Sequence, residues 1–206
     1  MGAAATPKRE LPGEKAARIV DAMRATVGAR GATGATFDVV AREAGVSRGL
    51  LHYYFGTKER LLAEVVRRDC DLRMERLSAT TAGAAGAQEL LASMVVALRE
   101  MLEESPEFLA VLLELHTLGR QNADIGAELS ELHRRVRGHL GGILAQARDA
   151  GVIGLAAEPE VVAEVLFSLA DGLGMRMLAE PGRDFEPTLV AALAAASALV
   201  RPPGAG

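Results

Sequence analysis

Apolar residues recur along this chain at intervals of three and four positions, from residue 16 to residue 200. Such spacing places side chains on one face of an α-helix, whereas a half-buried strand alternates apolar and polar residues. No alternating stretch is found in the sequence, so we expect an all-α protein. The expected helices cover residues 16–30, 37–44, 48–55, 58–77, 90–102, 108–118, 127–150, 159–173 and 187–200.

The two short helices between Thr36 and Phe55 are the most informative part of the chain. Thr36 and Ser47 stand where the N-cap of each helix should be, since a hydroxyl there accepts a hydrogen bond from the first turn. Gly45 ends the first helix after about two turns. Two short helices joined by a turn of about three or four residues that contains Gly form a helix-turn-helix, a DNA-binding motif. The side chains left outward on its second helix are Arg48, Gly49, His52 and Tyr53.

The charge is distributed unevenly along the chain. The 206 residues carry a net charge of −4. Residues 1–60 hold 10 Lys and Arg against 6 Asp and Glu, a difference of +4, while residues 61–206 hold 13 against 21, a difference of −8. A basic head on an acidic body concentrates the attraction for phosphate at one end. This distribution agrees with DNA binding by the helix-turn-helix.

Several protein classes are disfavoured by the sequence. No apolar run is long or clean enough to span a bilayer, and residues 1–15 lack the apolar region of a secretory signal. The single cysteine, Cys70, excludes an internal disulfide framework and agrees with a reducing cytoplasm; we interpret it as a small buried residue. No His or Cys pair has metal-ligand spacing within a helix, and no Gly-x-Ser-x-Gly elbow or phosphate-binding Gly loop occurs. We expect no catalytic residues, metal, cofactor or membrane contact, and a cytoplasmic location.

The last two expected helices, which begin at Pro159 and Pro187, are rich in Ala and apolar on more than one face. A helix without a polar face needs a partner that covers it. The same helix pair in a second copy would supply that cover in an isologous four-helix interface. We therefore expect a homodimer formed through the last two helices.

The segment Glu43–Val66, EAGVSRGLLHYYFGTKERLLAEVV, resembles the helix-turn-helix of the TetR/AcrR family of transcriptional regulators. The resemblance rests on a Gly-Val-Ser turn, a Tyr-Phe pair that closes the second helix, and Thr-Lys-Glu at the start of the next, and it covers roughly residues 14–68. It implies a homodimer whose two recognition helices enter successive major grooves of a palindromic operator, usually to repress. It also implies that a small molecule in the C-terminal domain moves the fourth helix and separates the two DNA-binding heads.

The resemblance also assigns DNA contacts residue by residue. Ser47 and the start of its helix would meet phosphate and bases. Arg48 and Gly49 hold the positions from which the family reaches base edges. By the same resemblance, Lys58 is expected to bind a phosphate, and Tyr53 occupies a further position that contacts the DNA backbone.

Two positions depart from the family pattern. Leu50 stands where many relatives have Thr; it cannot donate to a phosphate, but it can press against a thymine methyl group. His52 stands where most relatives have Tyr; it keeps a donor, loses reach, and attracts phosphate when protonated. These departures leave the operator sequence unpredicted. The residues expected at the DNA are Thr36, Ser47, Arg48, Gly49, Leu50, His52, Tyr53 and Lys58.

Candidate residues for a small-molecule site come from the apolar stretch Phe108–Leu118 and from scattered methionines. His116 lies four residues after Leu112 and eight after Phe108, so the three share a helix face. The imidazole is either a hydrogen-bonded core group or a group that orients a ligand. Met suits adaptable pockets, although it is also an ordinary core residue. The expected pocket residues are Met94, Met101, Phe108, Leu112 and His116.

Small residues and two Gly in 79–87, ATTAGAAGA, indicate a loop and a domain boundary. The expected division is a flexible basic arm (1–12), a helix-turn-helix DNA-binding domain (13–57), a connector helix (58–78), a ligand-binding and dimerisation domain (79–201) and a tail (202–206).

The leading hypothesis is a homodimeric repressor that a small, largely apolar effector releases from a palindromic operator. One alternative is an activator or architectural DNA binder without a small effector, which predicts a filled C-terminal core. Another is an enzyme or carrier that uses the C-terminal pocket, which requires a polar catalytic cluster that the sequence does not contain.

Overall fold

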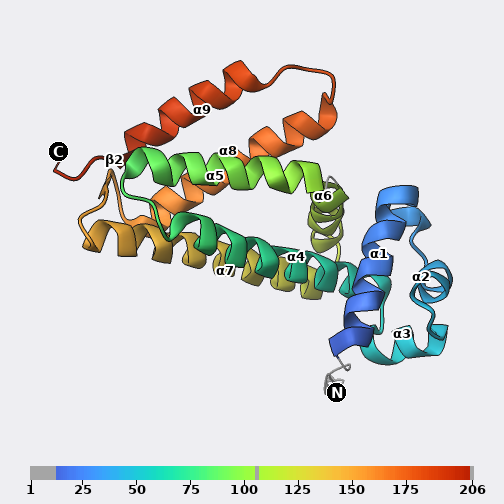
Figure 1. The fold of residues 1–206 in the computed structure, drawn as a ribbon. Helices are drawn as coiled ribbons and strands as arrows, with labels where there is room; N and C mark the ends of the chain where they lie inside the picture. The colour runs from blue at the N-terminus through green and yellow to red at the C-terminus, as the bar shows by residue number, and fades with distance from the viewer. Residues whose placement is uncertain (1–12, 105–106, 205–206) are drawn as a thin grey trace. The chain divides into compact units, whose positions relative to one another are not determined.

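Helices make up nearly all of the structure, a computed structural model that describes residues 13–104 and 107–204 (Figure 1). The expectation of an all-α protein is confirmed. The elements of the described residues are α1 (Gly13–Gly34), α2 (Phe37–Ala44), α3 (Arg48–Phe55), α4 (Lys58–Thr81), α5 (Ala87–Glu104), α6 (Glu107–Gly119), α7 (Ala123–Asp149), β1 (Gly154–Leu155), α8 (Pro159–Ala179), α9 (Glu186–Leu199) and β2 (Val200–Arg201).

The chain divides into two compact units, each with its own core. One unit contains the chain up to Arg68 together with Ala110–Leu129, and the other contains Asp69–Leu109 together with the chain from Ser130 onward. α4 is one continuous helix that belongs to the first unit up to Arg68 and to the second from Asp69. The domain division expected from the sequence stays a prediction, and its basic arm, residues 1–12, lies outside the described residues. No helix within 13–104 and 107–204 combines the length and hydrophobicity that a membrane span requires.

In the first unit, α1 packs against α2 and α2 against α3. Their contact surface is mainly apolar, and α3 contributes Leu51, which has no exposed surface. Full burial of a side chain of this size stabilises the fold by about 1.5–3 kcal/mol. Among the described residues, the other side chains of this unit that are 0–1% exposed are Ile19, Val20, Met23, Ala35, Val40, Leu61, Leu62, Val65, Val66, Val111 and Ile125.

The two helix caps expected from the sequence are confirmed. The Thr36 hydroxyl accepts from the N–H of Val39 at 3.4 Å, and the Ser47 hydroxyl accepts from the N–H of Leu50 at 3.2 Å. Gly45 ends α2 in the left-handed conformation, with φ 64° and ψ 38°, and its N–H bonds the last carbonyls of the helix. A left-handed residue at this position turns the chain sharply, so that α3 starts at once in a new direction.

The second unit is built from the later part of α4 and from α5, α7, α8 and α9. Its core side chains come from α5, α7, α8 and α9 and from the segments around the two short strands. They are Ala87, Leu90, Leu91, Leu140, Leu144, Ile153, Val162, Ala163, Ala196 and Val200.

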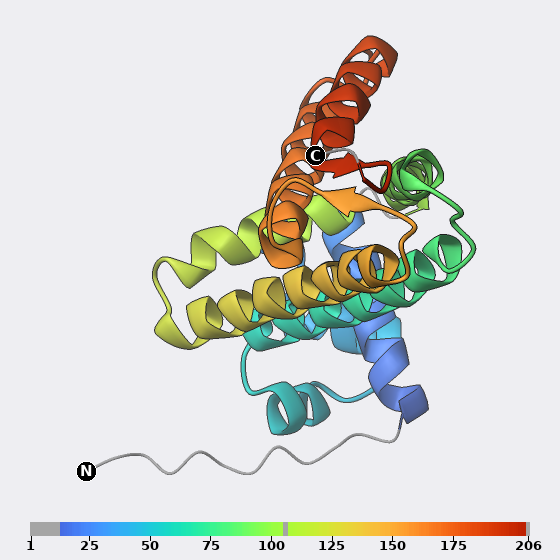
Figure 2. The same cartoon turned by 90° about the vertical axis from the view of Figure 1, so that its left-hand side faces the viewer.

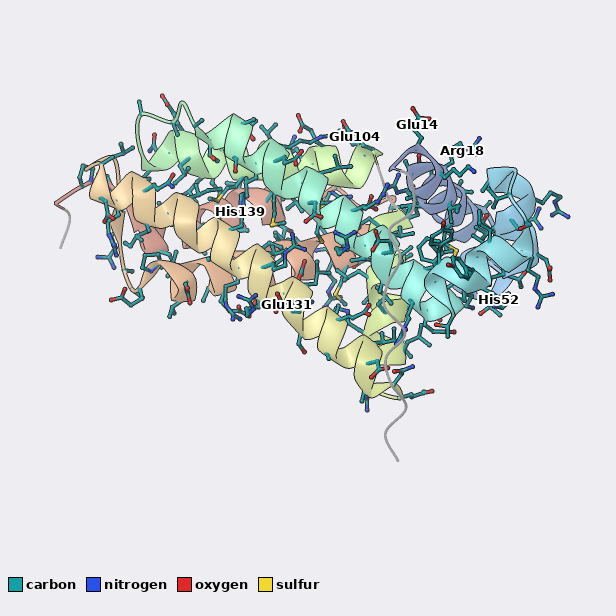
Figure 3. The ribbon with its side chains drawn as sticks, turned by 90° about the horizontal axis from the view of Figure 1, so that it is seen from below. Glu14, Arg18, His52, Glu104, Glu131 and His139 are labelled. Atoms are coloured by element: carbon teal, nitrogen blue, oxygen red, sulfur yellow. The ribbon has the colours of Figure 1, made fainter. Side chains whose placement is uncertain are left out.

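α4 and α7 lie side by side in this unit (Figures 1 and 2), and polar contacts join them. The Arg135 guanidinium on α7 donates to the Asp71 carboxylate on α4 at 2.6 Å. His139, labelled in Figure 3, places Nε2 2.9 Å from the Met74 carbonyl oxygen and 2.8 Å from the Ser78 hydroxyl. These contacts fix the later part of α4 to α7.

Helix boundaries differ from the expected ones where side-chain or backbone contacts outweigh apolar spacing. α1 does not stop at Gly31: that residue is non-helical, with φ 69° and ψ 167°, and helix resumes as far as Gly34. α7 begins at Ala123, before the expected start at 127, because the Asn122 side chain caps it by accepting from Asp124 N at 3.0 Å. Asn is among the preferred N-cap residues, and this signal precedes the first apolar repeat.

Two further features were not predicted. Val200, expected to be helical, lies in β2, which pairs antiparallel with β1 so that Leu155 faces Val200. Strands of two residues are too short to produce an alternating pattern. α6, which contains the apolar stretch Phe108–Leu118, buries Val111 and Leu115 but leaves His116 exposed, because one stripe of the helix is covered within a single chain.

Gly45→Ala and Gly49→Ala make the same chemical change four residues apart, and we expect opposite effects on stability. At Gly45 a Cβ is strained by the positive φ, so the free energy of unfolding should fall by about 1 kcal/mol. Gly49 lies inside α3 without a positive φ, and a Cβ there meets no atom of the described residues within 4 Å. Alanine at this position should raise the free energy of unfolding by about 0.5 kcal/mol through helix propensity. Urea denaturation measures both values, and shifts of the same sign contradict this account of the turn.

Candidate nucleic-acid interface

The buried Leu51 decides which side of α3 faces solvent. A helix turns by about 100° per residue, so Gly49 and Tyr53, two positions before and after Leu51, point away from the core. Tyr53 is 58% exposed, and Gly49 is exposed as well. Arg48 and His52 lie on a flank of α3, between Leu51 and Gly49 around the helix, and are also exposed. The outward face expected from the sequence is therefore present as a surface; its contacts with DNA stay a prediction.

The Arg48 guanidinium has partners within its own chain. Its Nη1 lies 3.2 Å from both carboxylate oxygens of Asp38 on α2, and its Nε donates to Nε2 of His52 at 3.3 Å. Asp38 lies in the first turn of α2. Its pairing with Arg48 was missed because the two residues lie ten positions apart and meet only across the turn.

His52 is held from three sides. Its Nδ1 lies 3.3 Å from the Gly56 carbonyl oxygen, and its ring stands edge-on to Phe37, with 4.8 Å between the ring centroids. A neutral ring with its proton on Nδ1 satisfies both ring nitrogens, since Nδ1–H donates to Gly56 and Nε2 accepts from Arg48. Figure 3 labels this side chain on α3.

The other expected contact residues also have roles inside the head. Lys58 donates from Nζ to the carbonyl oxygen of Ala32 at 3.0 Å, which ties the start of α4 to the end of α1. Tyr53 stands edge-on to Tyr54, with 5.0 Å between ring centroids. Leu50 is half-buried. An ammonium group has three donors, so one bond to a carbonyl leaves Lys58 donors for an anion.

Thr36 and Ser47 use their hydroxyls as caps, and the helix starts beside them carry backbone N–H groups. The N-terminus of a helix attracts phosphate through these N–H groups and the helix dipole. Both caps are exposed. The two helix starts thus add main-chain donors to the charged and aromatic groups of α3.

An apolar cavity of about 210 Å³ lies in the second unit, between α4, α5, α8 and α9. Charged groups from α4, α5 and α8 also line it: Arg73, Arg76, Glu100 and Asp171. Its apolar lining includes Leu77, Leu91, Met94, Leu98, Leu166, Leu169, Ala170, Leu173, Leu189 and Leu193. The sequence could not locate this cavity, because a cavity depends on how helices pack and not on the period of one helix.

The five residues expected to bind a small molecule are distributed over both units. Met94 lines the cavity, and Phe108 packs beneath the Arg73 guanidinium, whose Cζ lies 4.1 Å from the ring centroid. Leu112 and His116 belong to the first unit, where Nδ1 of His116 contacts the Leu112 carbonyl oxygen at 2.8 Å. The side chain of Met101 lies outside the described part of the chain. The role of these residues in ligand binding stays a prediction.

Cys70 is a buried free thiol on α4, as interpreted from the sequence. Burial raises the pKa of this thiol to about 12, far above neutral pH. The thiolate is the reactive form of cysteine, so Cys70 is chemically inert in the folded protein.

Comparison with known proteins identifies both halves of the chain. Residues 19–65 match the model of bacterial regulatory proteins of the tetR family, and residues 87–200 match the model of the C-terminal region of BetI-type transcriptional repressors. The HTH-type transcriptional regulator BetI of Agrobacterium fabrum is 34% identical over 123 residues, which is 59% of each chain. BetI of Rhizobium meliloti is 29% identical over 176 residues, which is 82% of this chain and 81% of that protein.

Solved structures show the same fold. A TetR-family transcriptional regulator from Rhodococcus sp. has a TM-score of 0.77 at 23% identity, covering 91% of this chain and 99% of the other. The transcriptional regulator FadR of Bacillus subtilis, in complex with stearoyl-CoA, has a TM-score of 0.72 at 21% identity, covering 87% and 96%. These structural similarities show the fold alone, because the sequence identities are low. The two family models match the sequence itself and together cover both halves of the chain. The chain belongs to the TetR family of bacterial regulatory proteins, with the C-terminal domain of BetI-type repressors, and is a transcriptional regulator and not an enzyme.

Proposed function

We propose that this regulator is a homodimeric repressor that holds a palindromic operator through α3 and leaves it when a small, largely apolar effector fills the cavity. The outward face of α3 carries the proposal. Gly49 is the key position, because no neighbouring atom in 13–104 or 107–204 requires the absence of a side chain there. A bare helix surface lets the backbone approach a ligand closely. As a repressor of bacterial genes, it would act in the cytoplasm, where the chromosome lies.

Each group on this face suits a particular part of a DNA major groove. Arg48 can donate two hydrogen bonds to O6 and N7 of a guanine, and Leu50 can contact a thymine methyl group. Lys58 and Tyr53 have donors for phosphates, which fix the register of the helix without reading sequence. His52 adds a donor to phosphate when it is protonated.

The surface of α8 supports the proposed homodimer. Val161, Val165 and Met175 are 54%, 41% and 45% exposed, and their spacing places them in one stripe along the helix. Gly172 lies in the same stripe, where a small residue permits close approach of another helix. α9, which packs beside α8 (Figures 1 and 2), exposes Val190. A second copy that covers this stripe would place two copies of α3 on one operator.

The cavity supports the effector part of the proposal. Its lining suits an apolar body, and its charged residues suit a single polar or charged end. Three lining residues, Arg73, Arg76 and Leu77, belong to α4. The same helix begins at Lys58 in the DNA-binding unit. An effector that favours another position of α4 would change the spacing of two heads and so shift the population away from the DNA-bound form.

An activator or architectural protein without an effector is the second candidate. That reading expects a filled core in the C-terminal half, and the cavity between α4, α5, α8 and α9 argues against it. The sign of regulation is a separate matter, which transcription assays on the bound promoter would decide.

DNase footprinting of the DNA upstream of its own gene tests the proposal as a whole. We expect protection of one palindromic site at moderate salt. Arg48→Ala should abolish the preference for this site, a loss of about 1–3 kcal/mol for one bidentate guanine contact. Lys58→Ala should instead weaken binding to all sequences and reduce the salt slope by about 1, because it removes a phosphate contact. Equal losses on all sequences for both variants contradict this division of roles.

Val165→Glu should convert the protein to a monomer, because a carboxylate in the α8 stripe would be buried without a partner in the dimer. Sedimentation velocity measures the change, and operator affinity should fall with it. Val96→Glu is the matched control: Val96 is equally exposed, at 46%, but lies on α5. A dimer that survives Val165→Glu, or is lost equally in Val96→Glu, refutes the proposed interface.

Ala170→Leu should narrow the cavity and weaken binding of an apolar probe such as N-phenylnaphthylamine, while operator affinity stays unchanged. Ala170 lines the cavity, whereas Ala92 is exposed on α5 and makes the control Ala92→Leu. Probe fluorescence in titrations of the two variants gives the comparison. Identical probe affinity in both variants means that this cavity is not the apolar site.

A further inference from the structure

The principal base-reading candidate of α3 is already engaged in the free protein. Arg48 uses Nη1 for the two carboxylate oxygens of Asp38, each at 3.2 Å, and Nε for His52, at 3.3 Å. Asp38 projects from α2, the helix before the turn, while Arg48 and His52 are one helical turn apart on α3. The arrangement joins the two helices of the motif at the edge of its outward face.

A bidentate contact with guanine uses two nitrogens of the guanidinium. Asp38 and His52 already bond two of the three guanidinium nitrogens of Arg48. A bidentate contact with guanine must therefore use at least one nitrogen that is already hydrogen-bonded. Asp38 presents both carboxylate oxygens to Nη1 of Arg48. In the major groove, guanine offers two acceptors, O6 and N7, in the plane of the guanidinium and so competes with Asp38 better than another base does.

The Asp38–Arg48 pair is weak enough to be exchanged. The side chains of Arg48 and Asp38 are 60% and 68% exposed, and pairs of this kind contribute little to stability because water screens them. Once Arg48 leaves, the carboxylate of Asp38 remains uncompensated near the DNA backbone and repels its phosphates. A complex therefore gains from releasing Arg48 only where a strong partner replaces Asp38.

We propose that Asp38 is a specificity-determining residue that acts through Arg48. On non-specific DNA the Asp38–Arg48 pair stays formed, whereas on the operator Arg48 leaves Asp38 and binds a guanine. This inference rests on the proposed reading of DNA by α3. Asp38 is a positioning residue in this role, since it contacts Arg48 and not the base. It lowers affinity for wrong sequences more than it lowers affinity for the operator.

The test is a double-mutant cycle scored by the ratio of the dissociation constants for a scrambled duplex and for the operator duplex. We expect Asp38→Asn to lower this ratio roughly tenfold, mainly by tightening binding to the scrambled duplex. In an Arg48→Ala background the same change should leave the ratio as it is. Asp38→Ser, also uncharged, repeats the measurement, and thermal melting verifies that each variant is folded.

Glu43→Gln is the matched control, because it removes one negative charge from the same helix, α2, at an exposed residue. It should tighten binding to both duplexes equally. A ratio unchanged by Asp38→Asn, or changed equally with and without Arg48, overturns the inference and leaves the operator reading intact. A wild-type protein that protects no DNA refutes the proposed function itself, and the inference falls with it.

Discussion

The outward face of α3 depends on the burial of Leu51 on the opposite side of the helix. This one side chain, with no exposed surface, holds α3 against the rest of the head. Burial of a leucine contributes about 1.5–3 kcal/mol, a large share of the net stability of a small domain. Because α3 has only eight residues, the burial of this side also determines the opposite side, where Gly49 and Tyr53 lie. One side of this short helix therefore stabilises the head, and the opposite side is the proposed DNA-binding surface.

The turn before α3 gives this contact its direction. Gly45 takes a left-handed conformation and Ser47 caps the next helix, so the chain changes course within a few residues. Across that turn Asp38 reaches Arg48. The turn that brings Arg48 to the edge of the outward face therefore also places Asp38 beside it, because both positions follow from the same backbone.

The second unit leaves apolar surface uncovered. Its helices leave an apolar cavity in the chain and an uncovered apolar stripe on α8. Buried aliphatic groups gain from contact with other atoms, so a cavity and a bare stripe are each places where a ligand or a second chain can add stability. α4 lines the cavity and, like α6 and α7, contributes to both units, so in the proposed mechanism it connects occupancy of the cavity to the head.

The features of the fold that depend on neighbouring residues could be predicted from the sequence, whereas those that depend on tertiary contacts could not. The helices, the caps at Thr36 and Ser47 and the turn at Gly45 could be predicted because apolar spacing, hydroxyl caps and a glycine act over a few residues. The pairing of Asp38 with Arg48 could not, since it forms only after α2 and α3 pack. The start of α7 was placed too late because apolar spacing was weighted above the Asn122 cap. The cavity was beyond the sequence, because it lies between helices that are distant along the chain.

Methylation interference distinguishes binding of the major groove by the outward face of α3 from other modes of DNA binding. Dimethyl sulfate modifies guanine at N7, in the major groove, and adenine at N3, in the minor groove. We expect that methylation of a guanine in each of two half-sites, centred about one helical turn apart, prevents binding. Interference confined to minor-groove adenines, or none at any guanine of a protected site, would contradict it.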